Sequence, residues 1–305
     1  MKRPRSGLFI LCCLLAAPLV AQPQIGGNTC NSSTLNGIYA FALSGRQVTS
    51  SGNFSNVFQG NGSATFDGLS KVTVTMTTDT IQAASTANWS GTYTMQSNCF
   101  GVVTITSGGS AILNLVSYDG GTNFLVTGND ATYSYSGGTG NTQPSGCSAS
   151  TFSGVYSFTG TGYSLASGAV NGVENGTGLL QFDGVSVITV NVNLSASGNT
   201  STATTLTGSY SVSSTCLGSA TLTDSKANSY TITLSVTNAN PVTAAGFYVT
   251  LAEIGKLLIS GSGHPLYGQP TVAAANHRAE DRPAAEVFAK LWTAAIHKGK
   301  AGWGA

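Results

Sequence analysis

Charged side chains are scarce in this chain of 305 residues, which has 12 lysines and arginines and 11 aspartates and glutamates. They make up 8% of the residues, whereas an average domain has about 25%. Between residues 30 and 263 the basic residues are Arg46, Lys71, Lys226 and Lys256. Without a basic stripe to contact phosphates, nucleic acid is a poor partner. Disorder is also disfavoured, because it combines high charge with low hydrophobicity, and 41% of this chain is hydrophobic.

Histidine is missing from the same region, because the three histidines are His264, His277 and His297. A Ser-His-Asp site would therefore have to borrow its base from the C-terminal end. Zinc is disfavoured since the cysteines lack C-x-x-C spacing and a nearby histidine. The sequence predicts neither a metal site nor a cofactor, and it favours a protein without enzymatic activity. A hydrolase that uses two carboxylates stays open, with these candidates: Asp67, Asp79, Asp119, Asp130, Glu174, Asp183 and Asp224.

A long apolar run occurs at the N-terminus, where residues 1–21 have the pattern of a secretory signal peptide. Lys2, Arg3 and Arg5 precede an apolar core that is too short for a comfortable membrane span. Removal of this segment leaves a mature chain without a transmembrane segment. The predicted location is extracellular or periplasmic, either secreted or at the cell surface. Short strands and a basic C-terminal end argue against a membrane-spanning barrel.

Four cysteines remain after the signal peptide, and they fall into two pairs with the same separation. Cys30 and Cys99 are 69 positions apart, and so are Cys147 and Cys216. In an exported chain, four cysteines indicate two disulfides, for which three pairings are possible. We favour Cys30 with Cys99 and Cys147 with Cys216, because each copy of the repeat is then self-contained.

The segments between the cysteines repeat the same landmarks in the same order. Gly-x-Tyr-x-Phe occurs at 37–41 and 154–158, Phe-Asp-Gly at 66–68 and 182–184, and a Gly-x-Tyr motif at 91–93 and 208–210. We therefore predict two repeats, at residues 28–136 and 147–263, joined by a glycine-rich linker at 137–146.

Alternation of apolar and polar residues predicts an all-β fold with about eight strands in each repeat. In the first repeat the strands are expected to start near Gly37, Phe54, Ser63, Lys71, Trp89, Phe100, Ala111 and Asn123. Such an antiparallel meander favours a barrel over a sandwich, because closure removes exposed edges. Asp67-Gly68 and Asp183-Gly184 are expected to form tight hairpin turns in which both residues have positive φ.

The C-terminal tail, residues 264–305, differs in composition from the repeats. Residues 283–298 have the pattern of an amphipathic helix, with an apolar stripe that includes Phe288, Leu291 and Trp292. The helix could dock on a barrel, dock on a partner or a membrane, or belong to a tail that is not the ancestral end of the chain.

The order of these motifs resembles an uncharacterised family of secreted bacterial proteins built from β-rich repeats. The likeness covers roughly residues 30–263 and implies no activity, because the family itself is uncharacterised. The opening strand is also similar, more distantly, to that of calycin-type barrels such as lipocalins, avidins and allene oxide cyclase-like domains. Lipocalins have Gly-x-Trp at this place, whereas this chain has Gly37-Ile38-Tyr39.

Three functions remain open for this sequence. We favour surface or matrix interaction, or adhesion, through faces rich in serine, threonine and asparagine. The second is a barrel that binds a small apolar or aromatic ligand, and the third is the carboxylate hydrolase. Seven aromatic residues are the candidates for lining a ligand cavity, although an ordinary packed core is the favoured explanation for them: Tyr39, Phe41, Trp89, Tyr93, Tyr156, Phe158 and Tyr210.

Overall fold

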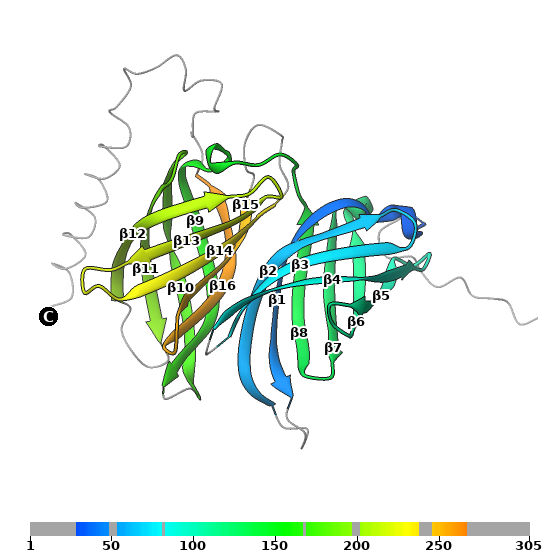
Figure 1. Ribbon diagram of the computed structural model, residues 1–305, viewed down its shortest axis with the longest axis horizontal. Coiled ribbons are helices and arrows are strands. Elements are labelled where there is room, and N and C mark those ends of the chain that lie inside the picture. The colour runs from blue at the N-terminus through cyan, green and yellow to red at the C-terminus, as the bar shows by residue number, and fades with distance from the viewer. Residues whose placement is uncertain are drawn as a thin grey trace, which may run out of the picture.

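The computed structural model describes residues 29–48, 54–80, 83–166, 169–196, 202–237 and 246–266. They form two closed antiparallel β-barrels of eight strands each, lying side by side (Figure 1). The all-β class and the preference for a barrel over a sandwich are confirmed. The predicted signal peptide, the helix at 283–298 and most of the tail lie outside the described residues.

Each strand pairs with its neighbours in sequence, and the first strand of each barrel closes on the last. Barrel 1 consists of β1 (Asn36–Val48), β2 (Phe54–Asp67), β3 (Lys71–Thr80), β4 (Ala84–Met95), β5 (Phe100–Ser107), β6 (Ala111–Tyr118), β7 (Asn123–Asp130) and β8 (Tyr133–Thr142). Barrel 2 consists of β9 (Ser153–Ala166), β10 (Ala169–Asp183), β11 (Val187–Ala196), β12 (Thr202–Val212), β13 (Leu217–Thr223), β14 (Ser229–Thr237), β15 (Gly246–Glu253) and β16 (Leu257–Pro265). Three short 3₁₀ segments accompany them: η1 (Ser32–Thr34), η2 (Asp119–Gly121) and η3 (Ala149–Thr151).

Two details of the predicted strand pattern are wrong, although the count of eight is right. The runs expected to start near Phe54 and Ser63 are one continuous strand, β2, because the glycines between them are tolerated in the ladder. The segment expected to be a linker, residues 137–146, belongs mostly to β8, which ends at Thr142. Its glycines let backbone and rings approach closely, and a Cβ on Gly140 would overlap the Phe124 ring.

The interior of each barrel is filled by a cluster of aromatic rings. In barrel 1, Phe66 packs edge-on against Tyr39 and Tyr93, with ring centroids 5.5 and 4.9 Å away. In barrel 2, Phe182 packs against Tyr156 and Tyr210 at 5.5 and 4.9 Å. Edge-to-face contacts of this kind add about 0.5–1.5 kcal/mol each beyond the area they bury. The same three-ring arrangement therefore stabilises both barrels.

A short N-terminal segment covers one end of each barrel. Leu35 follows η1 and Phe152 follows η3, and both side chains are fully buried. The Tyr93 hydroxyl lies 2.8 and 2.9 Å from the carbonyl oxygens of Ser32 and Leu35. The Tyr210 hydroxyl makes the corresponding bonds to the segment that contains Phe152.

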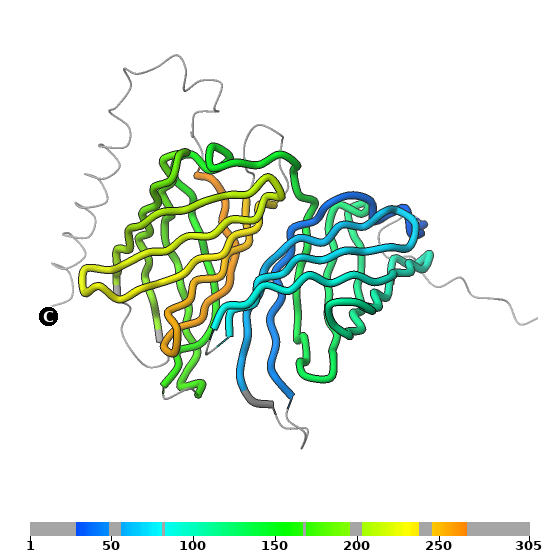
Figure 2. The backbone as a smooth tube through the Cα atoms, viewed as in Figure 1, coloured from blue at the N-terminus to red at the C-terminus, as the bar shows by residue number. Residues whose placement is uncertain are grey.

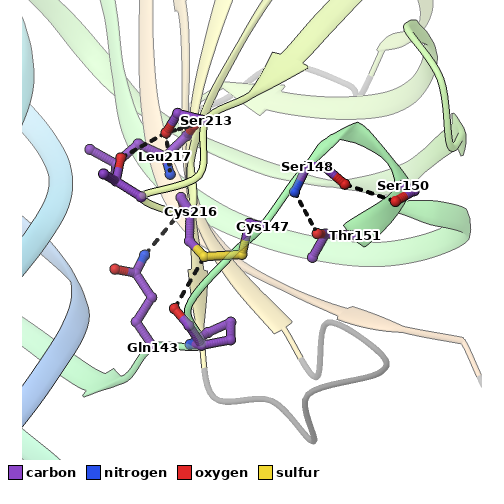
Figure 3. Close-up of a disulfide and its surroundings, with 10 residues drawn as sticks. Gln143, Cys147, Ser148, Ser150, Thr151, Ser213, Cys216 and Leu217 are labelled. Atoms are coloured by element: carbon purple, nitrogen blue, oxygen red, sulfur yellow. Dashed lines mark hydrogen bonds between the residues drawn. A yellow bond between two sulfur atoms is a disulfide. The ribbon is translucent and has the colours of Figure 1, made fainter.

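Disulfides join these covering segments to the barrels, and the favoured pairing is confirmed. Cys30 bonds to Cys99 and Cys147 to Cys216, with Cα atoms 5.0 and 4.9 Å apart. The connection between the barrels meets the second disulfide, where the Gln143 amide donates to the Cys216 carbonyl at 3.2 Å (Figure 3). Disulfides persist in oxidising compartments, which indicates an extracellular or periplasmic location.

We expect Tyr93→Phe to lower the free energy of unfolding by about 1–2 kcal/mol, because the buried carbonyls of the covering segment lose their donor. Urea denaturation with the disulfides intact measures the change. Tyr118→Phe is the matched control, since Tyr118 is exposed and its loss should change little. Equal stability of the two variants would contradict the role assigned to Tyr93.

Candidate functional site

The aromatic residues expected to line a ligand cavity all lie on inward faces of the barrels. Six of the seven are buried, and Trp89 is half-buried against the core of barrel 1. Their rings pack on one another or on neighbouring core side chains. A role in ligand binding remains a prediction for these residues, and their mutual contacts give them a packing role in any case.

Burial raises the pKa of the tyrosines in these clusters. The pKa of Tyr93 and that of Tyr210 rise to about 12, mainly through desolvation and secondarily through the nearby carboxylates of Asp67 and Asp183. These hydroxyls therefore stay protonated at neutral pH and act as hydrogen-bond donors to the covering segments.

Asp67 and Asp183 lie at the turns after β2 and β10. One carboxylate oxygen of Asp67 accepts from the backbone N–H groups of Leu69, Ser70 and Lys71 at 2.8–2.9 Å, and Asp183 does the same in barrel 2. These bonds lower the pKa of both carboxyls. Among these four turn residues only Gly68 and Gly184 have positive φ, so the expectation for the aspartates is wrong: the carboxylates organise longer loops.

Two other carboxylates are also engaged in turns. Asp130 accepts from the backbone N–H of Thr132 and from the Tyr135 hydroxyl. Asp224 accepts from the backbone and the side-chain amide of Asn228, and those bonds lower its pKa. A glycosidase needs one carboxyl with a raised pKa beside a second carboxylate. The lowered pKa of Asp224 is the opposite of what the acid of such a pair needs.

Glu174 faces the interior of barrel 2 and is 7% exposed. It pairs with Gly162 across β9 and β10, just as Phe58 pairs with Gly45 across β1 and β2. The two barrels therefore differ at this inward position, where barrel 1 has an aromatic ring and barrel 2 has a carboxyl group. The nearby inward glycine Gly176 leaves room that Ile259 and Leu194 approach.

A largely polar seam joins the barrels, where the outer faces of β1 and β2 meet those of β14–β16 (Figure 2). Asp79 of β3 and parts of β9 and β10 lie at its edges. Asn61 is 2% exposed, and its amide nitrogen lies 2.7 Å from Thr233 Oγ1 and 3.0 Å from Thr250 Oγ1. Ser260 donates to Gln59 Oε1 at 2.6 Å. An apolar cluster closes one end of the seam: Val57, Leu165, Ala252 and Leu258.

Asp79 is buried in this seam at 2% exposure. Desolvation raises its pKa to about 6, against the smaller effect of a 3.4 Å hydrogen bond from the Thr233 hydroxyl. Within the described part of the chain it forms no ion pair. A groove of about 170 Å³ lies beside the seam and is bordered mainly by small and polar residues: Ser44, Gln59, Thr161, Gly162, Tyr163, Val173 and Ser260.

Hydroxyl and amide groups form transverse rows on the outer faces away from the seam. Thr65, Thr73, Ser90 and Ser107 lie side by side across β2–β5. Thr189, Thr207 and Thr223 do so across β11–β13. Threonine–asparagine pairs lie next to these rows, at 2.9 Å in barrel 1 and 2.8 Å in barrel 2. We call these the hydroxyl rows.

Neither a metal cluster nor a membrane-crossing helix is found in the residues that the structure describes. No three potential metal ligands of the His, Cys, Asp or Glu type come together there. No helix in these ranges has the length and apolar character needed to cross a membrane.

Comparison with known proteins gives little beyond this geometry. No protein-family model matches the chain, and no curated protein matches it significantly. Two of the solved structures to which the chain is similar share 8% sequence identity with it. One, from Nitrosomonas europaea and provisionally assigned as AttH, has a TM-score of 0.26, with 75% of this chain and 91% of that chain covered. The other, a porin-like protein from Bacteroides uniformis, has a TM-score of 0.19, with 80% and 98% covered. At these scores neither likeness carries an argument about function.

The raised pKa of Asp79 leads us to expect an unusual pH dependence of the free energy of unfolding. A raised pKa means that the folded state takes up the proton more readily than the unfolded state. The stabilisation of the folded state by this proton is therefore complete below the ordinary pKa of 3.8, and it is lost as the pH rises through about 6. Asp79→Asn should remove this dependence and make the protein more stable than wild type at pH 8, by up to about 3 kcal/mol.

Denaturation midpoints measured from roughly pH 5 to pH 8 test this expectation. Asp67→Asn is the control, because the lowered pKa of Asp67 confines its own titration to more acidic pH. That variant should lose stability about equally across the range. If the stability of Asp79→Asn changes with pH as steeply as that of the wild type, the pH dependence comes from another group.

Proposed function

We propose that this chain is an exported, non-enzymatic protein that acts through surface or matrix interaction by the outer faces of its two barrels. The observation that supports this proposal is the division of side chains between the two sides of the sheets. Inward faces hold interlocked aromatic rings, whereas outward faces carry the uncharged hydroxyl rows. Export agrees with the two disulfides and with the predicted signal peptide.

Uncharged hydroxyl and amide groups suit a surface that binds by many weak hydrogen bonds. Such groups keep one face of each sheet wet without the long-range fields of charged residues. The rows occur at matching levels of both barrels, so one molecule presents two of them. Two linked binding faces raise the apparent affinity for an extended surface far above that of either alone.

A binding assay on the cells that export the protein tests this role. We expect Thr73→Lys combined with Thr207→Lys to reduce retention on the cell surface or its matrix at least about tenfold, because both hydroxyl rows are interrupted. Ser225→Lys is the matched control, since Ser225 is equally exposed but lies in a turn. Equal retention of both variants, with unchanged stability, would remove the hydroxyl rows from the binding surface.

The second candidate is a ligand-binding barrel, and Glu174 is the observation that favours it. A buried carboxyl among apolar side chains is the kind of polar group that orients a ligand in an otherwise apolar pocket. In barrel 2 it lies where barrel 1 has a phenyl ring.

Native mass spectrometry of the exported protein separates the two candidates. Under the surface proposal, the native mass equals the denatured mass or a whole multiple of it, apart from water and salt, and Glu174→Phe changes nothing but its own mass. A discrete adduct that is released on denaturation and missing from Glu174→Phe would replace the surface proposal with a ligand-binding one.

A further inference from the structure

The contact between the barrels joins two different surfaces. Barrel 2 uses mainly the outer faces of β14, β15 and β16, with parts of β9 and β10 at the edge of the contact, and barrel 1 uses those of β1 and β2, with Asp79 of β3. Because the barrels match strand for strand, each has a counterpart of both surfaces. Most of one counterpart on each barrel therefore lies outside the seam, although Tyr163 and Leu165 of β9 pack at its edge.

Pairing registers identify the unused counterpart on barrel 1. In barrel 2, Ser235 lies between Leu217 and Tyr248 in a transverse row, and the seam buries Ser235 to 0% and Tyr248 to 8% exposure. The same row in barrel 1 is Phe100, Val116 and Leu125. There Phe100 is 47% exposed and Leu125 is 52% exposed. Leu125 is thus open where its counterpart Tyr248 is covered, and Val116 is half-buried where its counterpart Ser235 is fully buried.

This row is continuous with the seam. Leu125 pairs with Thr139 on β8, and Thr139 accepts a hydrogen bond from the Tyr248 hydroxyl of barrel 2 at 3.4 Å. Ile112 and Tyr118, 53% and 39% exposed, extend the apolar surface along β6. We call Phe100, Ile112, Val116, Tyr118 and Leu125 the apolar row. The outward positions of β5–β7 carry no charge, so nothing there opposes association.

The complementary surface is the counterpart of β1–β3 on barrel 2, namely the outer faces of β9–β11. Thr177 and Asn175 occupy the positions that Asn61 and Gln59 hold in the seam. Both are exposed, and Val173, the counterpart of Val57, borders the groove at the edge of the seam. Outward side chains from Val173 to Gln181 are uncharged. The outward positions named on both surfaces are uncharged, whereas the seam itself buries Asp79.

We infer that the apolar row binds a second copy of this chain, docking on the outer face of its β9–β11 as barrel 2 docks on barrel 1. The contact is head to tail, so every added copy leaves one apolar row and one β9–β11 face open, and assembly continues beyond a dimer. This inference rests on the proposed function, because it treats the outer faces as the working surfaces and names one of their partners.

Sedimentation equilibrium of the full exported chain, over about a hundredfold range of concentration, tests the inference. The average mass is expected to rise with concentration past that of a dimer. Leu125→Lys should weaken association at least about tenfold, and Leu69→Lys, at a loop residue that is 75% exposed, should leave it unchanged. A wild-type protein that stays monomeric, or equal masses for the two variants, overturns the inference.

A mixing experiment distinguishes head-to-tail from symmetric association. Leu125→Lys blocks one surface, and Thr177→Lys blocks the other at an exposed position. Each variant alone should remain monomeric, whereas their mixture should form a dimer that grows no further. Full dimerisation of Thr177→Lys alone overturns the head-to-tail arrangement. Circular dichroism and an intact disulfide count confirm that both variants fold.

Failure of this inference is distinct from failure of the proposed function. A monomeric chain without a releasable adduct that still binds cells through its hydroxyl rows keeps the surface role and loses self-assembly. A releasable ligand adduct removes the surface role whatever the sedimentation result.

Discussion

Packing of rings against glycines inside a closed eight-stranded sheet is the constraint on which the rest of this structure depends. An eight-stranded interior is just wide enough for side chains to fill, and in this chain several bulky rings face positions that lack a Cβ. Phe124 faces Gly140, and Phe247 faces Gly263 in the same manner. Once the rings fill the interior, a single buried side chain of the covering segment, Leu35 or Phe152, closes the end of each barrel. A tyrosine hydroxyl holds that segment in place by hydrogen bonds to its carbonyl oxygens. The variable chemistry is left to the outer faces.

Much of this fold was predictable from the sequence because its signals are local or repeated. Alternation along Lys71–Thr80 places Val72, Val74 and Met76 inward, and the equal cysteine spacing pairs each half with itself. The predicted strand boundaries were wrong where glycine residues were taken as signs of a turn or linker. Gly137 to Gly140 read as a linker since glycine favours turns, whereas in a narrow barrel glycine is what a strand needs beside a ring.

The seam could not be predicted residue by residue, because the contact of two outer faces has no period of its own. Gln59, Asn61 and Asp79 look like ordinary exposed strand positions in sequence. One signal was available in β15, where Phe247 to Leu251 is nearly continuously apolar, a pattern typical of a strand covered on both sides. It indicates that a strand is covered without naming the covering surface.

The polar character of the seam also bears on the order in which the chain folds. Barrel 1 is complete when β8 closes on β1, and none of its strand pairs requires a residue beyond Thr142. Since the N-terminal half is synthesised first, it can close before barrel 2 exists. During that interval the surface that carries Gln59, Asn61 and Asp79 faces water, where an ionised Asp79 has no burial cost. An apolar seam surface would make barrel 1 prone to aggregation before barrel 2 has folded. A polar surface keeps barrel 1 soluble until barrel 2 docks on it.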